Sequence, residues 1–509
     1  MSSDRPHWYR RRIVIVIGAV VAVLTCAAAV FALTRPGDVF NPDVEFRAEP
    51  EETFVPTPVP GVKPKKKGNP LSGFAWAQYG YSRDRRRYLP AENSVRPPFR
   101  RRWSWSANSL LEFPPIIVGN RMYTTRNDGV VVSLNRTTGK QVWKRDMGYL
   151  AASSPAYGEK KIYITILERT KGVRAGRVAA IWAKSGKVSW SKPLPSRSES
   201  SPMVVDHRLF FGTENGTVYA MRTNDGSVQW KFQARGAAKG GLALNEGKLY
   251  FGTYGGHVYA IGQRSGKQVW HAGTSGATFG LRAGNFYATP AVAFGRVYIG
   301  NTDGNMYSFS AATGKLAWRR KTGSYVYASP AVAQVPGTKP TVYFGSYDGT
   351  FYALDARTGG TRWAFRDGGK ISGAATVVGD LVYYSNWGHR NTSALWAKSG
   401  KRAWKSERGA FNPVVSDGQT IYVTGFSSVA AFEPMSVAEV RRATERRAKK
   451  LAAKKKKQVA AAKKKKAAAA KKKAAAVKKK KAAAAKKKKA AAAKKKKAAA
   501  KKKGKEPSS

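Results

Sequence analysis

The stretch YFGSYDGTFYALDARTGGTRWAF occupies residues 343–365. Two short runs of aromatic and β-branched residues flank Asp348-Gly349, a pair that suits a tight hairpin because glycine reaches positive φ freely. A second turn, Thr358-Gly359, precedes a lone tryptophan, Trp363. Two turns this close together predict consecutive antiparallel strands. The same spacing recurs along the chain, and such recurrence indicates a repeat protein.

The step from a turn glycine to a tryptophan four residues later occurs seven times, and successive tryptophans are 40 to 48 residues apart. In the sixth copy, strands are expected near residues 329–333, 341–346, 351–356 and 361–366. A period of about 40–45 residues with four strands per unit is typical of a β-propeller blade. The predicted structural positions are Gly139/Trp143, Gly186/Trp190, Gly226/Trp230, Gly266/Trp270, Gly314/Trp318, Gly359/Trp363 and Gly400/Trp404.

The repeat region is incomplete at both ends. Residues 412–434 supply three strands without a tryptophan strand, whereas residues 97–105 supply a tryptophan strand, with Trp103, and no partners. Joining the two ends completes an eighth blade and leaves no open sheet edge. We therefore predict an all-β fold, an eight-bladed β-propeller of four-stranded antiparallel blades. Residues 113–434 form the propeller, and residues 71–112 form a lead-in that contains the closing strand.

The repeat resembles the tryptophan-docking propellers of the pyrroloquinoline quinone (PQQ) repeat family. A complete family motif stands at Ala353, Asp355, Thr358, Gly359 and Trp363. The resemblance covers about residues 74–434, and it includes the lead-in FAWAQYGYSRDRRRY at 74–88. It implies that each repeat tryptophan stacks between blades in a structural role. We expect the same role for Trp103 in the closing strand.

Within this family, enzymes and binding proteins differ in their sites. The resemblance to the quinone-dependent dehydrogenases implies an acidic calcium cage, a catalytic Asp and, in many members, two adjacent cysteines. This chain has one cysteine, Cys26, and its acidic residues between 113 and 434 are scattered. A calcium site needs several converging oxygens. We therefore predict no catalytic residue, cofactor or metal, as in the non-enzymatic branch that resembles outer-membrane assembly factor B.

The N-terminal region reads as a membrane anchor. Residues 13–33 are apolar or small and uncharged, long enough to span a bilayer core, and follow a basic segment at 1–12. The positive-inside rule then predicts a single-pass protein in the cell membrane, with a cytoplasmic N-terminus and an extracytoplasmic propeller and tail. A cleaved signal peptide and a lipoprotein signal remain alternatives. Residues 34–70 are rich in proline and predict an extended linker without regular structure.

The formal net charge of +62 is concentrated in two places. Residues 435–509 carry 33 Lys and Arg against 3 Glu, and residues 113–434 carry 41 against 17 Asp and Glu. Blocks of Ala and Lys without an apolar stripe predict a disordered or helical polycationic tail, which Ser436 and Glu439 could cap. The tail is similar to those of linker histones and heparin-binding adhesins. Such a field attracts polyanions, so cell-wall polymers, anionic glycans and DNA are the expected partners.

Insertions gather in loops on one face of the predicted propeller, because the second-to-third hairpin and the blade-to-blade connector lie at the same end of a blade. Basic residues beside aromatics in these loops suit polyanions, glycans or extended peptides. We predict that this face binds a partner, including a protein partner. The predicted binding residues are Arg169, Lys171, Arg174, Arg177, Arg282, Phe286, Tyr287, Trp387 and Arg390.

Together these features predict a membrane-anchored extracytoplasmic scaffold that binds proteins or anionic envelope polymers without catalysis. Two alternatives stay open at this point. One is a PQQ-dependent quinoprotein oxidoreductase, and the other is a nucleic-acid-binding protein that acts through the Lys/Ala tail.

Overall fold

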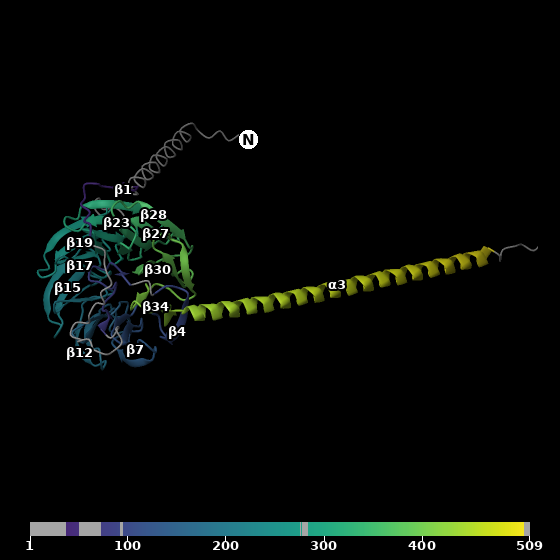
Figure 1. The fold of residues 1–509 in the computed structure, drawn as a ribbon, viewed down its shortest axis with the longest axis horizontal. Coiled ribbons are helices and arrows are strands. Elements are labelled where there is room, and N and C mark those ends of the chain that lie inside the picture. Colours follow the sequence, from purple (N-terminus) through teal and green to yellow (C-terminus); the bar gives the residue numbers. More distant parts are fainter. Residues whose placement is uncertain (1–36, 50–72, 92–94, 275, 277–283, 503–509) are drawn as a thin grey trace, which may run out of the picture. The chain divides into compact units, whose positions relative to one another are not determined.

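The computed structural model describes residues 37–49, 73–91, 95–274, 276 and 284–502. The chain divides into two compact units, residues 1–434 and 435–509. The first unit contains an eight-bladed β-propeller, whose blades follow one another around the ring in chain order (Figure 1). The second contains one long helix. The predicted propeller fold is thus confirmed.

Each blade is a four-stranded antiparallel sheet, and its strands are named here a to d from the propeller axis outward. In strand order a to d, blade 1 is β5 Ile116–Val118, β6 Arg121–Thr125, β7 Val130–Asn135, β8 Gln141–Asp146; blade 2 is β9 Ala156–Gly158, β10 Lys161–Ile166, β11 Arg177–Trp182, β12 Val188–Pro193; and blade 3 is β13 Met203–Val205, β14 Arg208–Gly212, β15 Thr217–Arg222, β16 Val228–Gln233. Blade 4 is β17 Ala243–Asn245, β18 Lys248–Gly252, β19 His257–Gly262, β20 Gln268–Gly273; blade 5 is β21 Ala291–Ala293, β22 Arg296–Gly300, β23 Asn305–Ser310, β24 Leu316–Lys321; and blade 6 is β25 Ala331–Ala333, β26 Thr341–Gly345, β27 Thr350–Asp355, β28 Thr361–Arg366. Blade 7 is β29 Thr376–Val378, β30 Leu381–Asn386, β31 Asn391–Trp396, β32 Arg402–Ser406; and blade 8 is β33 Val415–Ser416, β34 Ile421–Thr424, β35 Ser428–Pro434, β4 Phe99–Ser106.

Blade 8 is built from both ends of the propeller sequence. Strand β4 pairs antiparallel with β35, and the register places Trp103 opposite Ala431. The two strands lie side by side although more than 300 residues separate them in the chain (Figure 1). The predicted ring closure is therefore confirmed.

Each of seven tryptophans packs against a turn glycine of the next blade. A Cβ atom added at Gly359, for example, would lie 2.8 Å from Cδ2 of Trp318, so only glycine leaves room for the ring. The indole Nε1 of Trp318 also donates a 2.9 Å hydrogen bond to the carbonyl of Ala356 in that neighbouring blade. The other pairs are Trp103 with Gly139, Trp143 with Gly186, Trp190 with Gly226, Trp230 with Gly266, Trp270 with Gly314 and Trp363 with Gly400.

Trp404 departs from this pattern because blade 8 has no turn glycine at the matching place. Its ring meets Phe99 and Phe432 edge-on instead, with both centroids 5.2 Å away. The seam between blades 7 and 8 is thus made of aromatic side chains.

The described part of the expected linker, residues 37–49, differs from the prediction of a segment without structure. Strand β1 Val39–Phe40 adds to the outer edge of blade 5 by pairing with β24. The ring of Phe46 stacks on Phe294 at 5.4 Å, and the carboxylate of Asp38 accepts a 2.8 Å hydrogen bond from the Lys321 amide. Composition alone did not reveal these anchors, because they depend on partners about 250 to 280 residues away.

The membrane prediction requires a correction. The expected span, residues 13–33, lies outside the described residues. Within the part of the chain that the structure describes, no helix is both long enough and apolar enough to cross a bilayer. This finding contradicts the expected single-pass location in the cell membrane. The helix that is described, α3 Val437–Lys502, consists mostly of Lys and Ala.

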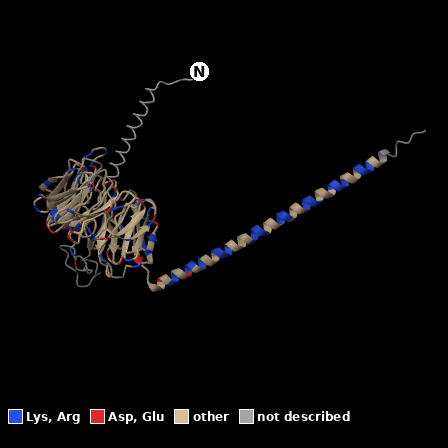
Figure 2. Ribbon diagram, turned by 90° about the horizontal axis from the view of Figure 1, so that it is seen from above, with Lys and Arg blue, Asp and Glu red and all other residues tan. Residues whose placement is uncertain are grey.

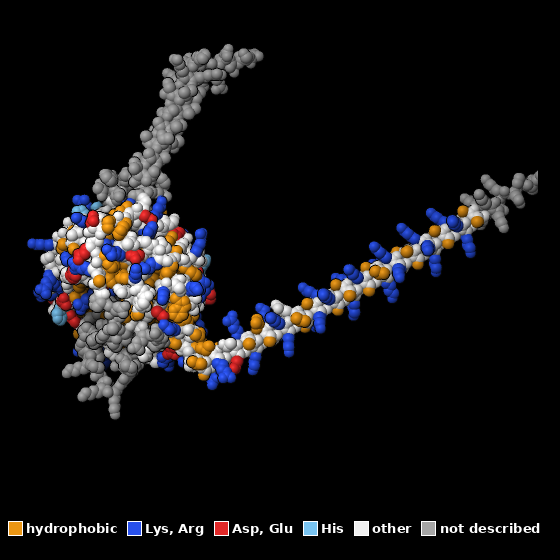
Figure 3. All heavy atoms as spheres, turned by 45° about the horizontal axis from the view of Figure 1, so that its top comes forward, with side chains coloured by type: hydrophobic (Ala, Val, Ile, Leu, Met, Phe, Trp, Pro, Cys, Tyr) orange, Lys and Arg blue, Asp and Glu red, His pale blue; other side chains and the backbone are white. Residues whose placement is uncertain are grey.

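Helix α3 is 66 residues long, roughly 100 Å at 1.5 Å per residue. It begins with a capping box, in which the Glu439 amide donates to the hydroxyl of Ser436 at 3.3 Å and the Ser436 amide donates to the Glu439 carboxylate at 2.9 Å. The side chains from Arg441 to Ala499 are all exposed. Lys and Arg residues recur along the described length of the helix (Figure 2), and their side chains project on all visible sides (Figure 3).

Candidate functional site

The segment of residues 73–91 closes one end of the propeller channel. Strand β2 Ala75–Trp76 pairs with β5, and β3 Tyr88–Leu89 lies parallel to β29. Between them, carbonyl groups of this segment accept hydrogen bonds from the innermost strands of blades 2, 4, 5 and 6. We call residues 73–91 the plug, because they join six blades across the axis.

Two buried arginines hold the plug in place. Arg85 donates from Nε to the Leu242 carbonyl at 2.8 Å, and Arg87 donates from Nη1 to the Pro330 carbonyl at 3.0 Å. The Arg87 guanidinium also lies 4.8 Å from the ring centroid of Tyr79. Burial lowers the pKa of both guanidinium groups. The buried charge of both guanidinium groups is stabilised by the carbonyl oxygens to which they donate. The contact with Arg87 also holds the Tyr79 ring in position.

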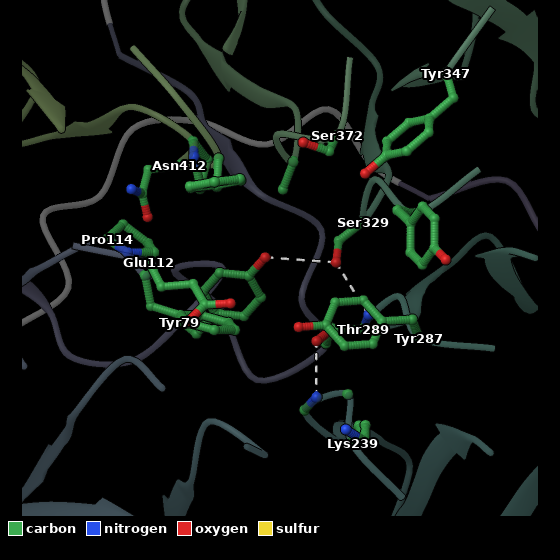
Figure 4. A pocket seen from close by; sticks show the side chains of 17 residues that line it. Tyr79, Glu112, Pro114, Lys239, Tyr287, Thr289, Ser329, Tyr347, Ser372 and Asn412 are labelled. Carbon is green, nitrogen blue, oxygen red and sulfur yellow. Dashed lines mark hydrogen bonds between the residues drawn. The ribbon is translucent and has the colours of Figure 1, made fainter. Parts of the chain in front are cut away.

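A cavity of about 240 Å³ lies above the plug, and Tyr79 forms part of its lining. Its other walls come chiefly from the connectors between blades, so it opens on the face that carries those connectors and the b–c hairpins. Figure 4 shows the Tyr79 hydroxyl directed at Ser329, to which it donates at 3.4 Å. The Ser329 oxygen in turn accepts a hydrogen bond from the Thr289 amide at 3.0 Å. We call this space the mouth cavity.

Two polar atoms that line the mouth cavity, Asn412 Oδ1 and Ser372 Oγ, have no hydrogen-bond partner among the described residues. Asn412 is only 1% exposed, and its Nδ2 donates a 2.7 Å hydrogen bond to the Leu111 carbonyl. That bond fixes the orientation of the side-chain amide and leaves Oδ1 as a buried acceptor without a hydrogen-bond partner. Buried acceptors in proteins are nearly always satisfied, so this atom is available to a donor that enters the cavity.

One side of the mouth carries a network of ion pairs across blades 2 to 4. Lys239 lies 2.8 Å from the carboxylate of Glu199 and 2.7 Å from that of Glu214. Arg197 lies 3.8 Å from Glu214 and 3.5 Å from Glu168. Burial raises the pKa of Glu199, although Lys239 opposes the shift. The charges here are largely compensated, so the network is more suited to fixing the connectors than to attracting a ligand.

The other side of the mouth carries a row of aromatic rings across blades 4 to 8. Neighbouring rings are 5.0 to 6.4 Å apart, measured between centroids, except where Lys370 lies between Tyr347 and Trp387. A second cation, Arg390, lies 5.2 Å from the ring of Phe426. We call this row the aromatic arc; it consists of Tyr254, Tyr287, Tyr327, Tyr347, Trp387, Phe411 and Phe426.

The predicted face residues are placed in three different ways. Tyr287 and Trp387 are part of the arc, and Trp387 lies exposed with Arg390 in the hairpin between β30 and β31. Phe286 is fully buried and packs edge-on against Tyr307, so it belongs to the core and cannot contact a partner. Arg282 lies outside the described residues.

The basic residues of the blade-2 hairpin lie on the same face but on the ionic side. Arg174 is 79% exposed and 4.0 Å from Glu214, and Lys171 is exposed. Arg169 and Arg177 are half-buried at the base of this hairpin. The structure therefore does not join them to the aromatic arc.

Sequence analysis missed most of the arc. Tyr254 and Tyr347 each stand two residues after the last glycine of a b strand, the same position that Glu214 occupies in blade 3. Alignment of the blades at this loop position would have shown the aromatics. Phe411 and Asn412 gave no such signal, because the connectors vary in length and sequence.

The residues present were tested against the calcium-bound quinone of the dehydrogenases. Among the residues that line the mouth cavity, Glu112 is the one carboxylate, and it accepts a hydrogen bond from Asn127 at 3.2 Å. Calcium takes about six to eight oxygen ligands, several of them carboxylate. The described residues contain no group of three or more His, Cys, Asp or Glu that could hold a metal ion. The cavity therefore does not fit a calcium cage.

Eight four-stranded blades joined by tryptophan–glycine contacts are the architecture expected of PQQ-type repeats. The family model described as outer membrane protein assembly factor BamB matches residues 127–334, 237–451 and 329–489, more than half of the chain. The chain belongs to this family.

Similar proteins include an outer membrane protein assembly factor and alcohol dehydrogenases. BamB from Moraxella catarrhalis superposes with a TM-score of 0.54 at 17% identity, covering 66% of this chain and 99% of that one. Quinohemoprotein alcohol dehydrogenase ADHIIG from Pseudomonas putida HK5 gives a TM-score of 0.58 at 16% identity, covering 70% and 80%. At these identities the likeness concerns the fold.

A relative by sequence is the dehydrogenase subunit of the quinone alcohol dehydrogenase of Gluconobacter oxydans (strain 621H), which is 28% identical over 186 residues. The match covers 33% of this chain and 22% of that protein. Proteins similar to this chain thus include both BamB and quinone-dependent dehydrogenases.

Proposed function

We propose that the chain is a non-catalytic binding scaffold, in which a BamB-like propeller is combined with a polycationic helix that binds anionic polymers. The main support for this proposal is helix α3. Its Lys side chains are exposed from Lys449 to Lys497, and the helix has no apolar stripe that could pack into a core or a coiled coil. An exposed row of like charges on one helix is destabilising unless a counter-charge is present.

A polyanion supplies that counter-charge over the full length. Binding releases the counterions condensed on the polymer, which is favourable and requires no particular geometry. The Lys ammonium group acts as a point charge, so phosphate, sulfate and carboxylate polymers are all acceptable partners. We therefore expect the helix to bind DNA, anionic glycans and wall polymers without strong preference.

The test compares the full chain with residues 1–434 and with a variant whose tail is scrambled at constant composition. Fluorescence anisotropy would measure binding to labelled duplex DNA and to labelled heparin at physiological salt. We expect the full chain and the scrambled variant to bind both polymers alike, and residues 1–434 to bind far more weakly. Equal binding by residues 1–434 would show that the helix is not the binding element.

A protein partner on the propeller is a second proposal, supported by the BamB family membership and by the blade-2 hairpin. This hairpin presents Val173, 43% exposed, beside the exposed Lys171 and Arg174. Arg is enriched at protein interfaces, and an exposed apolar side chain adds surface that a partner can bury. Cross-linking from a cysteine at position 173, compared with a cysteine at the distant exposed position Val269, would identify such a partner.

The quinoprotein alternative is the function that the dehydrogenase relatives raise. It receives less support because the mouth cavity offers one carboxylate where a calcium cage requires several. Addition of PQQ and Ca²⁺ to the purified protein, followed by dye reduction with primary alcohols, is the direct assay. Oxidation of an alcohol in this assay would contradict the scaffold proposal and support a quinoprotein oxidoreductase.

A further inference from the structure

We infer that the mouth cavity and the aromatic arc form a binding site for a neutral oligosaccharide, with one sugar ring in the cavity and the following rings along the arc. This inference goes beyond polyanion binding by α3 and does not depend on it. It rests on three features of the described residues: an unpaired acceptor, a set of aromatic faces and the local charge.

The unpaired acceptor requires a hydrogen-bond donor. Asn412 Oδ1 is buried, lines the cavity and has no partner, and its amide orientation is fixed through Leu111. Glu112 offers further acceptor oxygens in the same wall. A ligand with several hydroxyl groups would satisfy both side chains, whereas an apolar ligand would leave Asn412 unpaired.

The aromatic rings suit the faces of a sugar. Tyr287, Tyr327 and Tyr347 line the cavity, and the last two have centroids 5.0 Å apart at an angle of 45°. The C–H face of a pyranose carries small positive charge and packs on the negative π face of an aromatic ring. The phenol hydroxyls can also exchange hydrogen bonds with the sugar hydroxyls. Figure 4 shows the Tyr347 hydroxyl directed toward Ser329 and the inside of the cavity.

The size of the cavity favours one ring. Its volume of about 240 Å³ is below the range of about 300–1,000 Å³ that holds drug-sized molecules. The arc continues outward from the cavity, because Phe411 lines it and stacks on Trp387 at 5.9 Å, with 27° between the rings. Phe411 also contacts Phe426 at 6.4 Å. A chain of sugars can therefore leave the cavity along a continuous aromatic surface.

The charges favour a neutral ligand in the cavity itself. Lys239 is already neutralised by Glu199 and Glu214, so it offers little attraction to an anion. Glu112 would repel an anion, and burial raises the pKa of this carboxyl group. A cation is disfavoured by the basic propeller, in which residues 113–434 carry 41 Lys and Arg against 17 Asp and Glu.

The test uses the full chain and four neutral probes: maltotriose, mannotriose, cellotriose and the trimer of N-acetylglucosamine. Saturation-transfer NMR detects binding, and titration calorimetry gives Kd at 0.1 M and 1 M NaCl. We expect saturable binding of at least one probe with a Kd that salt leaves unchanged, because no charge is neutralised. This salt independence separates the site from polyanion binding by α3.

Variants locate the site. Tyr347→Ala should weaken binding by about tenfold, and Tyr347→Phe should retain most of it. Asn412→Leu should also weaken binding, although loss of the hydrogen bond to Leu111 can affect folding. The matched control is Tyr149→Ala, since Tyr149 is 46% exposed in another connector of this face and is not part of the arc.

Absence of binding by all four probes would overturn the inference. So would equal affinity of the wild type and Tyr347→Ala, provided that both show the same thermal unfolding. If polyanion binding fails while a neutral probe binds, the proposed function is wrong and the sugar site stands.

Discussion

Single residues hold the blades together at their seams. In five blades a tyrosine of strand b and the tryptophan of strand d donate to the same carbonyl of the next blade, as Tyr343 and Trp363 do to Ala397. The remaining pairs are Tyr123 and Trp143, Tyr163 and Trp190, Tyr250 and Trp270, and Tyr298 and Trp318. Each of these five seams therefore combines a large packed ring with hydrogen bonds that bridge two blades.

Replacement of Trp363 tests this role. Trp363→Ala removes the ring that fills the space beside Gly400 and the hydrogen bond to Ala397. We expect the free energy of unfolding to fall by about 3–5 kcal/mol in chemical denaturation. Trp182→Ala is the control, because Trp182 is 42% exposed, and its cost should stay below about 1 kcal/mol. Equal losses for the two variants would contradict a packing role specific to the seams.

Glu112 makes stability depend on pH. Burial raises its pKa above the ordinary value of 4.5, so the folded state binds the proton more tightly than the unfolded chain does. The ionised carboxylate therefore costs stability at pH 7, and this cost disappears as the pH falls through the raised pKa. We expect Glu112→Gln to raise the melting temperature modestly at pH 7 and to match the wild type near pH 4. A difference that is the same at both pH values would exclude this explanation.

Among the elements, β4 has the largest structural consequence. It supplies the outer strand of blade 8 and carries Trp103, which packs on Gly139 of blade 1. Without it, β35 would present an unpaired edge that invites association with other chains. The plug, in the same region, adds the contacts of Arg85 and Arg87 across the axis.

Deletion of residues 71–110 should therefore lower the melting temperature of the propeller and produce aggregation in size-exclusion chromatography. Deletion of residues 435–509 serves as the control of similar scale. It should leave the melting temperature unchanged, since the two units are separately compact. A monomeric product of unchanged stability after the first deletion would refute closure by β4.

The repeat made these elements predictable from the sequence. Expected strands at 341–346 and 361–366 correspond to β26 Thr341–Gly345 and β28 Thr361–Arg366, because turn glycines fix their ends. The path of the plug and the anchoring of residues 37–49 were not predictable, since neither repeats and both depend on distant partners. The mouth cavity likewise combines connectors of unequal length, so periodicity could not indicate that Asn412 and Tyr79 line one space.

At the level of the whole molecule, two units with different chemistry share one chain. The propeller is a rigid ring that presents the mouth cavity and the aromatic arc. Helix α3 is an extended polycation whose charge is not compensated within the tail, because residues 435–509 carry 33 Lys and Arg against 3 Glu. The scaffold proposal predicts that these units bind different ligands by different physical effects.

Salt dependence of binding tests the proposed role of α3 most directly. For duplex DNA as the probe, log K should fall linearly with log salt, with a slope of about −0.9 for each phosphate neutralised. We expect a steep slope for the full chain, an equally steep slope for the scrambled tail, and a much flatter one for residues 1–434. If residues 1–434 retain the full slope, the charge that binds the polymer lies on the propeller, and the proposed role of the helix is wrong.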